Sequence, residues 1–102
     1  MYLVHAQLEL PDAAQLPPGI RASVRRAIDP ADRVEHVAVH PRPPRGLILG
    51  LYLLAGALEE AEERAVLVCE RLLRAMPELA GARLTGAGVP VLPLAFVPQP
   101  VD

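Results

Sequence analysis

Lysine, asparagine and tryptophan are absent from the sequence, so all 10 basic side chains are arginines. Without lysine the chain has no residue for a Schiff base and none for a Walker phosphate-binding loop. Aromatic residues make up only 3% of the chain, too few for a platform on which nucleic-acid bases stack. The net charge is −2, and the only basic cluster is Arg21, Arg25 and Arg26. We therefore expect no nucleic-acid partner.

Cysteine and long apolar runs are equally scarce. Cys69 is the single cysteine, so no disulfide forms within the chain, and its place among apolar helix positions indicates a buried structural thiol. Hydrophobic residues reach 52%, yet no run approaches the ~20 residues of a membrane span. No basic segment precedes an apolar one at the N-terminus. We expect a cytoplasmic protein with no membrane partner.

The length of 102 residues is enough for one hydrophobic core and too short for two. We expect a single domain over residues 1–92, followed by a C-terminal tail over residues 93–102. The tail still contains Leu94, Phe96 and Val97, which makes it a candidate arm on a partner subunit.

The most apolar stretch, LILGLYLL at residues 47–54, predicts a strand in the middle of a sheet. It has no charge, lies between Gly46 and Gly56, and is apolar on both faces, so both faces need cover. The longest predicted helix follows over residues 57–76, where apolar positions recur every three or four residues. Acidic residues crowd its first turns and arginines its last, as the helix dipole favours, and Pro77 ends it.

The other elements are shorter. Residues 2–10 alternate between apolar and polar and predict a strand. A weak helix is expected over residues 18–28. Residues 33–40 are alternating and β-branched, which predicts a strand with Glu35, Val37 and Val39 on one face and Val34, His36, Ala38 and His40 on the other. Residues 82–92 predict a last strand at a sheet edge, because glycine and proline weaken it.

The order strand, helix, strand, strand, helix, strand is the split βαβ pattern. We therefore predict an α+β fold, a ferredoxin-like βαββαβ sandwich whose antiparallel sheet has the order 4-1-3-2 and both helices on one face. The other face of the sheet would then carry His5, Gln7, His36, Ala38, Ile48, Gly50 and Tyr52.

Through this element order and the LILGLYLL strand, residues 2–92 resemble the ferredoxin-like, dimeric α/β-barrel group, in which two such sheets pack face to face. The phrases DRVEHVAVHP, GLYLLA and LEEAEERA are also similar to small uncharacterised proteins of GC-rich bacteria. The group includes cofactor-independent monooxygenases, haem-degrading enzymes and ligand sensors. The resemblance therefore implies a homodimer and leaves the activity open.

The polar residues His5, Gln7, His36 and Tyr52 are the candidates for a ligand or catalytic face. A histidine can act as a general base and Tyr52 as a donor, and Gly50 leaves room beside them. The alternative is that these side chains are ordinary polar residues that form hydrogen bonds across a dimer contact. No serine hydrolase elbow, glycine-rich phosphate loop or paired catalytic carboxylate is visible.

A metal site is not expected from the three histidines. His36 and His40, four residues apart on one strand, have Cα atoms ~13 Å apart. His5 and His36 would be separated by ~9–10 Å across the sheet, against a metal–nitrogen distance of ~2 Å. We expect neither a metal nor another cofactor.

The loop PRPPR, residues 41–45, has the P-x-x-P spacing of a polyproline ligand, with Arg42 and Arg45 as candidates for partner contact. A stiff hairpin turn is the simpler interpretation. Its arginines can still meet an acidic group on a protein or a carboxylate ligand.

Together these features favour a small homodimeric binding or accessory module whose ligand, a small molecule or a protein, is unknown. The alternative is a cofactor-independent monooxygenase or isomerase acting on a hydrophobic small molecule, with His5 or His36 as base and Tyr52 as donor. That reaction would need a closed apolar pocket reached by one of these side chains.

Overall fold

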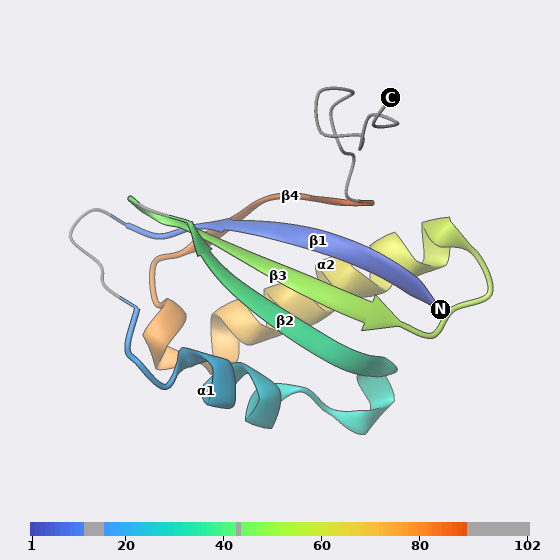
Figure 1. Ribbon diagram of the computed structural model, residues 1–102, viewed down its shortest axis with the longest axis horizontal. Helices are drawn as coiled ribbons and strands as arrows, with labels where there is room; N and C mark the ends of the chain where they lie inside the picture. The colour runs from blue at the N-terminus through green and yellow to red at the C-terminus, as the bar shows by residue number, and fades with distance from the viewer. Residues whose placement is uncertain (12–15, 43, 90–102) are drawn as a thin grey trace, which may run out of the picture.

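The computed structural model describes residues 1–11, 16–42 and 44–89. This part of the chain forms four strands and two α-helices (Figure 1), which confirms the predicted α+β class. The elements are β1 (Tyr2–Glu9), α1 (Ile20–Ala27), β2 (Val34–Arg42), β3 (Gly46–Leu53), α2 (Leu58–Ala75) and β4 (Arg83–Gly88). The last predicted strand extended over residues 82–92; positions 90–92 and the predicted tail over residues 93–102 lie outside the described residues.

The four strands form one antiparallel sheet in the order β2-β3-β1-β4. The LILGLYLL stretch is β3, and it lies in the interior of the sheet between β2 and β1. It pairs with β1 from Leu53, opposite Tyr2, to Gly46, opposite Glu9. Its four leucines are completely buried on one face.

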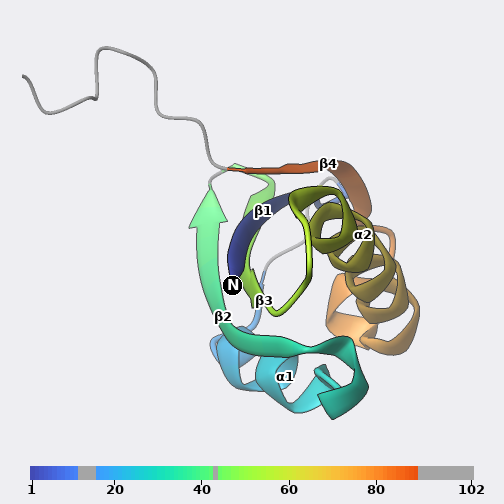
Figure 2. The ribbon, with the colours of Figure 1, turned by 90° about the vertical axis from the view of Figure 1, so that its right-hand side faces the viewer.

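Both helices pack on this leucine face of the sheet (Figure 2). The alternation in β1 turns Val4, Ala6 and Leu8 to the same side, and the apolar stripe of α2 lies against them. The core contributed by α2 consists of Ala61, Ala65, Val68, Cys69 and Leu72. The helix-facing residues of β3 and most of those of β1 and the middle of β2 are therefore buried, while no described element covers the other face.

The predicted alternation is wrong at the start of β2. The pairing shifts between Val34, opposite Leu53, and His36, opposite Tyr52, so that Glu35 is an extra residue in a β-bulge. Val34 packs against the core and Glu35 is exposed, the reverse of the predicted faces. Burying an unpaired carboxylate would cost free energy, and the bulge avoids this cost because it points the Glu35 side chain toward solvent.

The segment between α1 and β2 is tied to α2 by one arginine. Arg71 donates a hydrogen bond to the carbonyl oxygen of Ala27 at 2.9 Å and forms an ion pair with Asp32. Asp32 also accepts a hydrogen bond from the backbone N–H of Asp29, within a capping box on a short 3₁₀ helix. These contacts position α1 and α2 side by side over the sheet.

Among the described residues, no helix is both long and apolar enough to cross a membrane.

Candidate functional site

The face of the sheet that no described element covers, hereafter the uncovered face, is built from four rows of side chains that run across the strands. Strand pairing defines the rows from one end to the other as His36, Tyr52 and Leu3; Ala38, Gly50, His5 and Gly88; His40, Ile48, Gln7 and Gly86; and Arg42, Gly46, Glu9 and Arg83. The first row is aromatic and apolar, and the last is charged. Three glycines and one alanine account for half of the positions in the two middle rows, so little side-chain volume projects from the sheet at those positions.

The predicted ligand-face residues all lie on the uncovered face, but they do not converge. The rings of His36 and Tyr52 are in contact, with centroids 5.4 Å apart and planes tilted by 54°. His5 lies one row away from them, opposite Gly50. A Cβ atom at Gly50 would be 3.5 Å from both Leu3 and Ala38 and 3.6 Å from His5, and Gly50 is buried. The side chains of Leu3, Ala38 and His5 therefore reduce the space that was expected beside Tyr52 for a small molecule.

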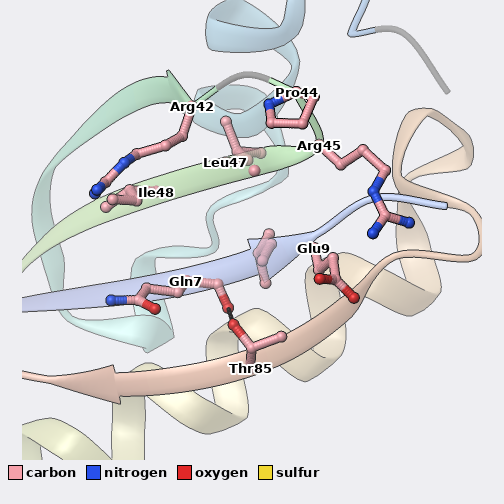
Figure 3. Close-up of a pocket in the computed structure, with 10 residues that line it drawn as sticks. Gln7, Glu9, Arg42, Pro44, Arg45, Leu47, Ile48 and Thr85 are labelled. Carbon is pink, nitrogen blue, oxygen red and sulfur yellow. Dashed lines mark hydrogen bonds between the residues drawn. The ribbon is translucent and has the colours of Figure 1, made fainter. Parts of the chain in front are cut away.

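A pocket of about 320 Å³ lies at the other end of this face, beside the β2–β3 hairpin (Figure 3). We call it the hairpin pocket; ten residues line it, among them Gln7, Glu9, Arg42, Arg45, Gly46 and Ile48. In Figure 3 Arg42 extends alongside Ile48, while Arg45 points toward the Glu9 end. The pocket thus joins Gln7, predicted as part of a ligand face, to both arginines predicted as partner contacts.

Gly46 allows β2 and β3 to approach closely beside the hairpin pocket. It lies on the uncovered face between Arg42 on β2 and Glu9 on β1. A Cβ atom there would be 2.8 Å from the carbonyl oxygen of Arg42, closer than a side chain tolerates. The tight hairpin therefore requires glycine at this position, because Arg42 occupies the place of a side chain.

Two arginines, Arg83 and Arg45, set the electrostatics at the Glu9 end. Arg83 donates from Nε and Nη2 to one carboxylate oxygen of Glu9, at 3.1 and 2.7 Å. The hydrogen bond and charge of Arg83, with a smaller contribution from the charge of Arg45, hold the pKa of Glu9 below its ordinary value. Glu9 therefore remains a carboxylate, and its charge is balanced within the site.

The side chain of Arg42 differs from those of Arg83 and Arg45. Its guanidinium has no ion-pair or hydrogen-bond partner within the described ranges. The amide of Gln7 likewise makes no side-chain hydrogen bond to another described residue, whereas its backbone oxygen accepts one from Thr85 at 3.1 Å. The pocket therefore offers one guanidinium and one amide to a ligand, beside the apolar side chain of Ile48.

Sequence reasoning missed Glu9, Gly46 and Thr85 as parts of this pocket. The alternation in β1 already placed Glu9 on the same face as Gln7, and a hairpin at residues 41–45 brings the end of β2 to the start of β3. Thr85 could not have been found, because it is the extra residue of β4 at the register shift between Gln7 and Leu8, and that shift is a property of the paired strands.

Metal ligation has no support in the described part of the chain, where no three His, Cys, Asp or Glu side chains gather closely enough to hold an ion. The chain matches no family model, and no curated protein is similar to it in sequence. The arrangement of side chains is therefore the basis for every functional proposal below.

Cys69 is not part of this site. It is fully buried on α2, and burial raises the pKa of its thiol to about 12. The unfolded chain loses this proton at lower pH than the folded chain, so stability is lost as the pH rises above the unfolded pKa of about 9. Between pH 8 and 10 we expect the free energy of unfolding of the wild type to fall by about 1.4 kcal/mol more than that of Cys69→Ala.

Urea unfolding of both proteins at each pH, with a reductant present, measures this difference. Parallel pH profiles would show that the folded thiol ionises as readily as the unfolded one. A thiol reagent should also leave native Cys69 unmodified at pH 8 and react after unfolding.

Proposed function

We propose that the protein is a small cytoplasmic binding module with a ferredoxin-like sandwich fold, and that it forms a homodimer in which two uncovered faces pack together. One observation carries this proposal. Leu3, Ile48 and Tyr52 remain half-buried rather than buried, on a face that no described element covers. Leu3 and Tyr52 are neighbours on paired strands, and apolar side chains that remain on an open sheet face favour a partner.

The size of the uncovered face is suited to a second copy. Strands ~4.8 Å apart and rows ~7 Å apart give it an area on the order of 600 Å² with its side chains. This approaches the ~800 Å² that each partner buries in a standard interface. The glycine and alanine positions of the middle rows can receive the Tyr52 side chain of the other copy, so the face can be complementary to itself, as a twofold interface requires.

Charge limits how two such faces can pair. The last row contains Arg42 and Arg83 with one acidic residue, Glu9, so like charges would meet if the two last rows coincided. A twofold axis that runs across the strands avoids this, because it sets the last row of one copy over the first row of the other.

Sedimentation tests the pairing. At micromolar concentration we expect a species of about twice 11.0 kDa. Ala38→Glu, which places a charge in a middle row of the uncovered face, should give the monomer, because burying unpaired charges costs several kcal/mol. Ala22→Glu makes the same change at an exposed position on α1 and should remain a dimer. A monomeric wild type, or a fully dimeric Ala38→Glu, would refute the pairing, and circular dichroism verifies that both variants fold.

The monooxygenase or isomerase alternative stays a prediction of the sequence. It needs an enclosed apolar pocket, and the hairpin pocket is not lined by His5, His36 or Tyr52. His36 lines a smaller depression of about 180 Å³, but Arg25 and Glu35 are among its other walls. The geometry therefore favours binding over catalysis.

A further inference from the structure

We propose that the hairpin pocket binds a small organic monocarboxylate, with Arg42 and Gln7 holding the carboxylate and Ile48 contacting the apolar body of the ligand. The inference deepens the proposed function and rests on it for the binding role. The pocket itself is complete within one chain, because every residue that lines it comes from β1, the β2–β3 hairpin, β3 or β4 of that chain.

The guanidinium of Arg42 identifies the charge of the ligand. Arg42 lines the pocket, and its guanidinium has no ion-pair partner in residues 1–11, 16–42 and 44–89. A planar guanidinium matches a carboxylate with two parallel hydrogen bonds. Gln7 lies on β1, two strands away from Arg42 on β2. Its side-chain amide N–H can donate a further hydrogen bond to the same anion.

Glu9 limits the charge that the pocket accepts. Its carboxylate lines the pocket and stays ionised beside Arg83 and Arg45. The positive charges of Arg83 and Arg45 already act on Glu9, so Arg42 is the guanidinium that remains for a ligand. One guanidinium neutralises the single charge of a carboxylate but only part of the charge of phosphate, so a single carboxylate at the Arg42 side is favoured.

Ile48 and the pocket volume define the rest of the ligand. Ile48 is half-buried and lies alongside Arg42 (Figure 3), so an apolar group attached to the carboxylate would cover it. A volume of about 320 Å³ is at the small end of ligand pockets. A short aliphatic or aromatic acid fits this description, and hexanoate and benzoate are suitable probes.

Titration followed by amide and arginine Nε–H NMR spectra tests the site. Hexanoate and benzoate should shift the signals of Arg42, Gln7 and Ile48, and hexanol and inorganic phosphate should leave them in place. Arg42→Gln should weaken hexanoate binding about tenfold or more, as expected for loss of a charge-assisted pair. The matched change Arg74→Gln, on the exposed side of α2, should have no effect.

A second variant separates the apolar contact from the charge. Ile48→Thr keeps a β-branched residue in the strand and should reduce the preference for hexanoate over acetate, with acetate affinity retained. The proposal is overturned if Arg42→Gln binds hexanoate as the wild type does, if phosphate competes as well as hexanoate, or if the shifts occur away from the pocket.

The monomeric Ala38→Glu variant distinguishes this inference from the proposed pairing. It should still bind hexanoate at Arg42, because no second chain is needed. Binding by a wild type that sediments as a monomer would support the pocket while refuting the pairing. Loss of binding in Ala38→Glu together with retention in Ala22→Glu would refute a pocket complete within one chain.

Discussion

Replacing Leu51 by alanine is expected to lower the free energy of unfolding by about 3 kcal/mol. Leu51 lies at the middle of β3, is completely buried and faces the helices, so truncation leaves a cavity that the surrounding core cannot close. Domains of this size are stable by only about 5–15 kcal/mol, so this single change removes a large fraction of the total. Urea unfolding at a fixed protein concentration measures it.

Leu67→Ala is the matched control, because it removes the same atoms from a side chain on α2 that is 64% exposed. We expect a change within about 0.5 kcal/mol. Equal losses in the two variants would contradict a core between the leucine face of the sheet and α2.

Replacing Gly46 by alanine is expected to cost about 2 kcal/mol and also to weaken hexanoate binding. The new Cβ atom would lie 2.8 Å from the carbonyl oxygen and 3.0 Å from the Cβ atom of Arg42, so the hairpin must open to receive it. The opening moves Arg42, which lines the pocket, and this displacement weakens the binding. Chemical denaturation and the hexanoate titration measure the two effects.

Gly86→Ala is the control for this change. Gly86 also lies on the uncovered face, opposite Gln7, but a Cβ atom there has nothing within 4 Å. We expect its stability to stay within about 0.5 kcal/mol of the wild type or to rise, since alanine restricts the unfolded chain. If Gly46→Ala were as well tolerated as Gly86→Ala, the close approach at the hairpin would not constrain the fold.

The elements of this protein were predictable because their signals are local. The LILGLYLL run, the alternation in residues 2–10 and the three- and four-residue spacing of α2 each identify an element, and the structure differs from the predicted ends by one to a few residues. The bulge at Glu35 was not predictable from alternation. It depends on how β2 meets β3 and on the cost of burying a carboxylate, and both are properties of the packed sheet.

The same division holds for the candidate site. Alternation alone assigns His5, Gln7, His36 and Tyr52 to one face of the sheet, and the sequence alone places Arg42 and Arg45 in a hairpin. The amino-acid pattern therefore determined the element types, the buried face and the chemistry available on the other face. Only the tertiary structure decided that Gln7 shares a pocket with the two arginines and that His5 stays apart from the His36–Tyr52 pair. Those relations depend on strand register and on the close approach of β2 to β3 at Gly46, which arise when strands pair.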